Sequence, residues 1–229
     1  MCYTPQVSLA TAFIEWVLAI VMIKTFKKTL LRDYFAVLIV LLGVYQFSEF
    51  MLCTSGYAKF WATFGFVTYT FLPAVCLDAV TRFLGRKVHP AIVYAIPVLV
   101  SAFTVVSGSF VTEAYCILFY VRILNVFNQA QGGYLRVASI VYSAYYTGFI
   151  VLSGVLMLSA HRKESDRRKR RLHLCVPVGI LLMGIPTYIV MFVLPGTDFT
   201  FPSVLCHFAL FFAMTAFLAV YYESAAIEG

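Results

Sequence analysis

Long apolar runs separated by short polar connections fill this chain from one end to the other. A helix needs about 20 predominantly apolar residues to cross a bilayer, and seven runs reach that length. They are residues 6–23, 34–53, 60–83, 89–110, 137–160, 173–194 and 201–222. The pattern predicts an all-α fold, in which the whole chain, 1–229, forms a single bundle of seven transmembrane helices.

Composition supports a membrane protein. Of the 229 residues, 62% are hydrophobic and 12% are charged, and the mean hydropathy is +0.90. A soluble domain is roughly half apolar and a quarter charged. No basic stretch precedes the first apolar run, so we expect that run to remain as a helix rather than to be a cleaved signal peptide. The lipid bilayer of a plasma or cytoplasmic membrane is the expected partner.

Basic residues predict the orientation. With seven crossings, fourteen of the seventeen Lys and Arg residues fall on one side of the membrane, and only Lys59, Arg122 and Arg136 fall on the other. Basic connections stay in the cytoplasm, which predicts an outside N-terminus and an inside C-terminus. The net charge of +7 is then a signal of topology, and the location of the basic residues argues against a nucleic-acid partner.

Two connections stand out. Residues 161–172 carry seven of the basic residues and are expected to be a solvated cytoplasmic loop, with docking of a membrane-protein partner or contact with anionic lipid as alternatives. Residues 111–136 are expected on the outer side. Their β-branched and aromatic core is too short to cross the membrane, so it predicts a strand or hairpin lying over the bundle as a lid, or else an interfacial helix.

Glu49 is the most informative polar residue, because it lies within the apolar run 34–53. A carboxylate at membrane depth costs several kcal/mol, so it usually has a partner or a function. Gln46, Glu49 and Cys53 share one helix face, and Ser8, Thr11 and Glu15 share a face of the first helix.

We expect these faces to converge on an outward-facing polar pocket, because the first, second and seventh helices are expected neighbours. At about 1.5 Å per residue, Glu49 and His207 lie roughly 6–9 Å below the outer surface, and Glu15 roughly 14 Å. The predicted ligand-binding residues are Glu49, Gln46, Glu15, His207 and Thr187. The alternative is a structural network in which these groups only hold helices together, at about 0.6–2 kcal/mol each.

Asp78 is expected to be structural. Arg82 follows it at i+4, which is the spacing of a local ion pair on a helix.

Four of the six cysteines, Cys2, Cys53, Cys116 and Cys206, map to the outer side. Up to two disulfides are expected there, and we favour Cys2 with Cys206 and Cys53 with Cys116. The alternative is a metal site formed by Cys2, Cys206, His207 and Glu49, although adjacent Cys and His on a helix point about 100° apart.

Several activities are excluded. No Lys lies within a predicted span, which rules out a retinal Schiff base, and the chain has no HExxH motif, nucleophile elbow or phosphate-binding glycine loop. The cofactor therefore stays unknown.

The segments MCYTPQVSLATAFIEW, YQFSEFML and PSVLCHFA resemble a widespread family of small multipass membrane proteins that has no established activity. Its members open Met-Cys-aromatic-Ser, carry a Gln-x-x-Glu element in the second helix and repeat a Ser-Val-Trp-Cys-like element in the last. These elements fall on Cys2, Gln46, Glu49 and Cys206. The chain departs from these elements at three positions. It has Thr4 in place of the Ser, Leu205 in place of the Trp, and Cys53 where the family has an aromatic residue.

The expected function is binding of a small solute, ion or lipid headgroup in the outward-facing pocket, for transport or sensing. Glu49 would supply the charge or exchange a proton, and Gln46 and Thr187 would orient the ligand. The alternatives are a membrane-embedded hydrolase, with or without a metal, and a structural subunit of a membrane complex.

Overall fold

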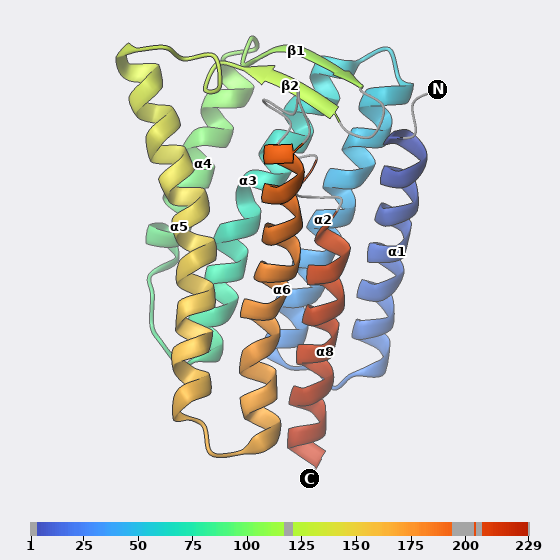
Figure 1. Ribbon diagram of the computed structural model, residues 1–229, viewed down its shortest axis with the longest axis vertical. Helices are drawn as coiled ribbons and strands as arrows, with labels where there is room; N and C mark the ends of the chain where they lie inside the picture. Colours follow the sequence, from blue (N-terminus) through green and yellow to red (C-terminus); the bar gives the residue numbers. More distant parts are fainter. Residues whose placement is uncertain (1–3, 117–120, 194–203, 205–207, 229) are drawn as a thin grey trace.

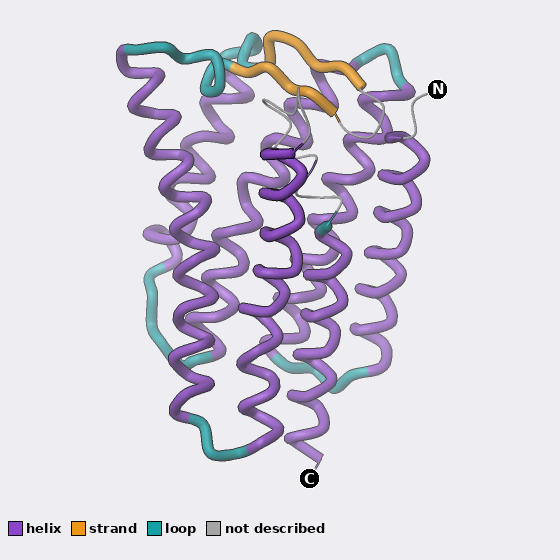
Figure 2. Tube along the Cα trace, in the orientation of Figure 1, coloured by secondary structure: helices purple, strands orange, loops and turns teal. Residues whose placement is uncertain are grey.

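Seven helices run side by side along one axis in the computed structural model, which describes residues 4–116, 121–193, 204 and 208–228 (Figure 1). The helices are α1 (Thr4–Thr25), α2 (Leu30–Thr54), α3 (Ala58–Phe83), α4 (Pro90–Val106), α5 (Gly133–Lys163), α6 (Arg167–Val193) and α8 (Ala209–Glu228). Two strands, β1 (Val111–Cys116) and β2 (Val121–Asn125), lie across one end of the bundle (Figure 2). We call this the hairpin end, and we call the opposite end, which holds the α5–α6 connection, the basic end.

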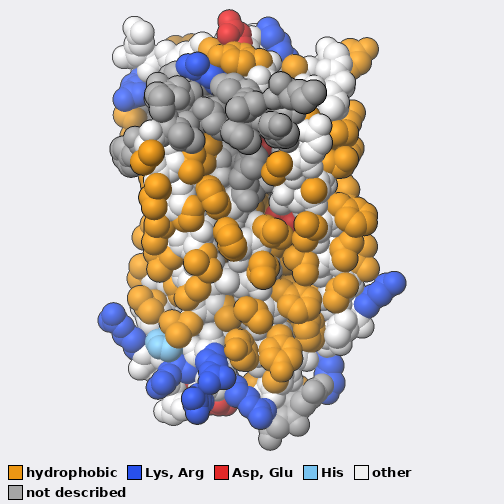
Figure 3. All heavy atoms as spheres, turned by 45° about the vertical axis from the view of Figure 1, so that its right-hand side comes forward, with side chains coloured by type: hydrophobic (Ala, Val, Ile, Leu, Met, Phe, Trp, Pro, Cys, Tyr) orange, Lys and Arg blue, Asp and Glu red, His pale blue; other side chains and the backbone are white. Residues whose placement is uncertain are grey.

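Six of these helices are long and apolar enough to cross a membrane, all except α4. The run 89–110 forms a helix of only 17 residues, because α4 ends at Val106. Part of the run 201–222 lies outside the described residues, and α8 begins at Ala209. Apolar side chains cover the middle of the visible face, and Lys and Arg gather at its ends (Figure 3). This distribution is consistent with a membrane protein.

Local chemistry determines where several helices begin and end. The Thr29 hydroxyl accepts a bond from the Arg32 amide at 3.1 Å and caps α2, which satisfies one of the free amides of the first turn. His89 caps α4 through Nδ1, and Pro90 occupies its first turn, where the missing N–H costs nothing. Gly85, with φ of 69°, follows the end of α3, and a left-handed residue suits this position.

The core is centred on α3, which packs against α2, α4, α5 and β1. Phe66 stacks on Tyr142 of α5 with ring centroids 5.5 Å apart. The hydroxyls of Thr70 and Tyr142 are 2.9 Å apart, and Tyr145 donates to the Thr70 carbonyl at 2.7 Å. Each buried hydroxyl therefore has a partner in the turn of α3 that precedes Pro73.

The segment 111–136 contains an antiparallel hairpin, in which Ala114 pairs with Ile123 and Cys116 with Val121. Val121 and Ile123 are buried and alternate with less buried residues, so one face of β2 packs on the bundle. Phe110 and Phe127 flank the hairpin and pack against Phe66. Of the two predicted alternatives, the hairpin is present. The interfacial helix is not found in the described part of this segment.

The connection between α5 and α6 is shorter than the predicted loop 161–172. Only residues 164–166 separate the two helices. Arg162 and Lys163 belong to the last turn of α5, and the basic run that begins at Arg167 forms the first turns of α6. All seven basic residues of this segment therefore lie on α5 or α6.

Candidate functional site

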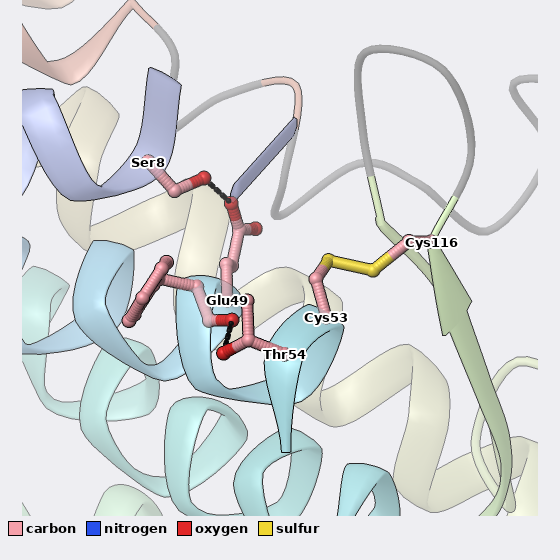
Figure 4. Close-up of a disulfide and its surroundings, with 6 residues drawn as sticks. Ser8, Glu49, Cys53, Thr54 and Cys116 are labelled. Carbon is pink, nitrogen blue, oxygen red and sulfur yellow. Dashed lines mark hydrogen bonds between the residues drawn. A yellow bond between two sulfur atoms is a disulfide. The ribbon is translucent and has the colours of Figure 1, made fainter. Parts of the chain in front are cut away.

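The site begins with a hydrogen bond between α1 and α2 near the hairpin end. Ser8 Oγ donates to Glu49 Oε2 at 3.2 Å, and both residues are buried (Figure 4). The contact follows from helix periodicity, because Ser8 lies on the polar face of α1 and Glu49 on the polar face of α2. The expected neighbours are confirmed for the described part of the chain, since α1, α2 and α8 all contact one another.

A disulfide fixes the hairpin beside this site. Cys53 lies one turn beyond Glu49 on α2, and it is bonded to Cys116 at the end of β1 (Figure 4). This confirms one of the two predicted pairings. The bond joins residues 63 apart in the chain, so it holds the end of β1 against the end of α2.

Gln46 lies one turn deeper on the same face of α2 and is fully buried. Both Gln46 and Glu49 have interaction partners within the protein. Ser48, between them in sequence, is also buried and donates to the Tyr45 carbonyl at 2.6 Å. This part of α2 is therefore polar and closely packed.

Glu15 differs from the other polar residues of this region. Its side chain is fully buried at 0% exposure, and neither carboxylate oxygen has a hydrogen-bond partner among the described residues. Glu15 follows Ser8 by two helical turns on the same face of α1, about 10 Å further from the hairpin end. A buried carboxylate that lacks a partner is costly in its charged form.

The next residue, Trp16, shows how closely α1 and α2 approach at this depth. A Cβ on Gly43 would lie 2.5 Å from Trp16 Nε1, so only glycine leaves room for the indole. The indole N–H also donates to the Val40 carbonyl at 3.4 Å. The tight interface keeps the Glu15 backbone next to α2.

Thr187 is buried on α6, but its described bond is local. Its hydroxyl donates to the Met183 carbonyl at 2.7 Å, which supports the turn of α6 at Pro186 and makes no link to Glu49. His207, Cys206 and Cys2 lie outside the described residues. Their predicted roles, including the Cys2–Cys206 disulfide, stay predictions.

No group of three or more His, Cys, Asp or Glu side chains that could hold a metal ion occurs within residues 4–116, 121–193, 204 and 208–228. The predicted metal site depends on Cys2, Cys206 and His207, which fall in the gaps of those ranges. Glu49 is its one described member.

Asp78 forms a larger network than the predicted ion pair. The pair is present, with Arg82 Nε 2.6 Å from Asp78 Oδ1. Tyr34 of α2 and Tyr94 of α4 also donate to Asp78 Oδ2, at 2.8 and 3.2 Å. Asp78 therefore joins three helices at the basic end, and spacing along one helix carries no signal for the two tyrosines.

No protein family, curated protein or solved structure matches this chain.

Proposed function

We propose that this protein is a multipass membrane protein that binds a small cationic solute or ion between α1 and α2, for transport or sensing. Glu49 and Glu15 would supply the negative charge, and Gln46 would orient the ligand. The observation that carries this proposal is the complete burial of Glu15, whose carboxylate has no partner among the described residues.

The charge of the site favours a cation over the other predicted ligands. Two buried acids, Glu15 and Glu49, belong to the facing surfaces of α1 and α2. Fixed acids within a membrane protein commonly mark ion or proton pathways. An anionic lipid headgroup would meet repulsion from both carboxylates.

The proposal includes seven crossings, with the N-terminus outside and the C-terminus inside. The termini of the described chain lie at opposite ends of the bundle (Figure 1), which agrees with an odd number of crossings. At 17 residues, α4 is about 25 Å long, somewhat short of the roughly 30 Å hydrocarbon layer. The basic end would face the cytoplasm, and the hairpin would cover the outer mouth of the site.

Carbodiimide labelling tests the proposal directly, because dicyclohexylcarbodiimide reacts with protonated carboxyl groups in apolar surroundings. The purified chain would be labelled across a range of pH values in sodium, potassium, calcium or choline chloride at equal ionic strength, and the modified acids identified by mass spectrometry. We expect labelling of Glu15 and Glu49, with saturable protection by at least one of the metal cations.

Glu113→Gln provides the matched control, because Glu113 is exposed on β1 and its replacement removes the same charge. Glu15→Gln and Glu49→Gln should each abolish one labelled site while the chain stays monodisperse by size-exclusion chromatography. Labelling of both acids that no cation affects would contradict the proposal. A double-mutant cycle that gives no coupling between the two substitutions would contradict a shared site.

A structural subunit of a membrane complex is the second candidate, and the Ser8–Glu49 bond favours it. A hydrogen bond between two helices is also what a structural network contains. This alternative predicts that Glu49→Gln lowers thermal stability and releases a copurifying partner, without any cation-dependent protection. The membrane-embedded hydrolase depends on Cys206 and His207 and stays a prediction.

A further inference from the structure

A basic hollow lies at the basic end of the bundle, at the opposite end from the proposed cation site. Arg167, Arg168 and Arg171 line it together with Asp166 and Ala226, and its volume is about 470 Å³. These residues come from the start of α6 and the end of α8. The hollow is large enough for a charged headgroup.

The start of α6 is unfavourable for an isolated helix. Its first turn is basic, and the one acidic group beside it is Asp166, whose carboxylate accepts from the Arg168 amide and caps the helix. In addition, Arg167 and Arg171 are four residues apart and repel each other on one face. A bound anion would relieve this repulsion, because it would interact with both guanidinium groups.

Other contacts give the hollow a defined shape. Arg168 Nη1 donates to the Ala225 carbonyl of α8 at 2.6 Å. His161 Nδ1 of α5 lies 2.8 Å from the Arg170 carbonyl, and Asp166 Oδ1 accepts from the Arg168 amide at 2.8 Å. The ends of α5, α6 and α8 are thus tied together around the hollow, and the Arg167 and Arg171 side chains are exposed.

The hollow lies just beyond the apolar surface of the bundle. Leu158 on α5 and Val178 on α6 are exposed apolar residues. Val178 follows Arg171 by seven residues, which is about 10 Å along the helix. In a membrane, this separation places the arginines at the level of the lipid headgroups.

We propose that this hollow binds the phosphorylated headgroup of an anionic lipid. The guanidinium fork matches phosphate oxygens with paired hydrogen bonds, and basic clusters directly beside membrane helices attract anionic lipids. Arg167 and Arg171 would contact the phosphate oxygens, while Arg168 holds α8 in place. This site is independent of the proposed function.

The experiment compares two double variants of the full chain in nanodiscs. R167Q/R171Q removes two charges from the hollow, and R86Q/K87Q removes two exposed charges from the same end but outside it. Both variants lose the same charge at the same end, so an effect on membrane insertion would appear in both. Retention of phosphatidylinositol phosphate against phosphatidylcholine would be measured by native mass spectrometry, and soluble inositol trisphosphate would be added as a competitor.

We expect R167Q/R171Q to weaken retention of phosphatidylinositol phosphate by about tenfold, which is about 1.4 kcal/mol, and R86Q/K87Q to weaken it by less than about twofold. Equal losses in both variants would overturn the site, because they would indicate diffuse attraction by basic charge. Binding of soluble inositol trisphosphate as tightly as the lipid would overturn the lipid assignment in favour of a free phosphate compound. Failure of this test leaves the carbodiimide result unaffected.

Discussion

Ser8 of α1 donates its hydroxyl hydrogen to Glu49 of α2 at 3.2 Å, inside the bundle and one turn from the disulfide at Cys53. This bond links the two helices that carry the candidate site. It also gives Glu49 a defined position near the hairpin end, whereas Glu15, two turns further along α1, has no hydrogen-bond partner among the described residues. The two buried acids therefore have different environments on one interface.

A double-mutant cycle between Ser8→Ala and Glu49→Met should measure the strength of this contact. We expect a coupling energy of about 0.6–2 kcal/mol, because both variants remove the same hydrogen bond between helices. Thermal or denaturant unfolding in detergent gives the required free energies. With Glu49→Gln the coupling energy should be smaller, since the amide oxygen still accepts from Ser8. If Ser8→Ala and Glu49→Met show no coupling, the bond does not contribute to stability.

Replacement of Glu15 by methionine should stabilise the protein and impair cation binding. The methionine side chain has a similar length and removes a buried carboxyl group whose burial costs about 1–3 kcal/mol when no partner compensates it. Unfolding in detergent should show the gain, and carbodiimide labelling should show the loss of the site. Glu113→Met, at an exposed position, is the control. A destabilised Glu15→Met variant would show that this acid is structural.

Loss of the Cys53–Cys116 disulfide should loosen the hairpin more than the bundle. For a loop closed between residues 63 apart, removal costs about 2–4 kcal/mol. We expect Cys53→Ser to make the hairpin sensitive to protease while the helix content by circular dichroism is unchanged. Cys175→Ser, at a free cysteine on α6, should change neither; an unchanged protease pattern in Cys53→Ser would show that packing alone holds the hairpin.

Asp78→Asn should destabilise the basic end. The carboxylate accepts bonds from Tyr34, Tyr94 and Arg82, and weakening a buried acceptor that has several partners costs about 1–3 kcal/mol. Asp33→Asn is the control, because Asp33 pairs with Arg32 but its side chain is 45% exposed, and exposed pairs contribute about 0–1 kcal/mol. Equal losses of stability in unfolding experiments would contradict the role of Asp78 as a link among three helices.

Two glycine substitutions should have opposite effects. Gly43→Ala places a methyl group against Trp16 and should destabilise the α1–α2 interface by about 1–3 kcal/mol. Gly148→Ala, in α5, meets no atom within 4 Å and should stabilise the helix by about 0.5–1 kcal/mol. Both variants would be unfolded under one set of conditions. If Gly43→Ala is not destabilised, the close approach of α1 and α2 is contradicted.

Features that depend on a single helix could be predicted from the sequence. The length of each apolar run predicts the helices α1, α2, α3, α5 and α6, because the thickness of the bilayer requires about 20 apolar residues. The spacing of Asp78 and Arg82 predicts their ion pair, because residues four apart are neighbours on a helix. The grouping of cysteines by side of the membrane favoured the pairing of Cys53 with Cys116.

Contacts between residues of different helices could not be predicted in this way and are seen in the folded bundle. Ser8 proved to be the partner of Glu49, Tyr34 and Tyr94 joined Asp78, and the basic residues after Asp166 lie on α6 around a hollow rather than in a loop. These contacts depend on how each helix is rotated about its axis and how closely it approaches its neighbour. A bulky residue such as Trp16 against Gly43 sets that approach. Hydrophobic periodicity does not show which face of a helix meets its neighbour, because lipid and protein both favour apolar side chains.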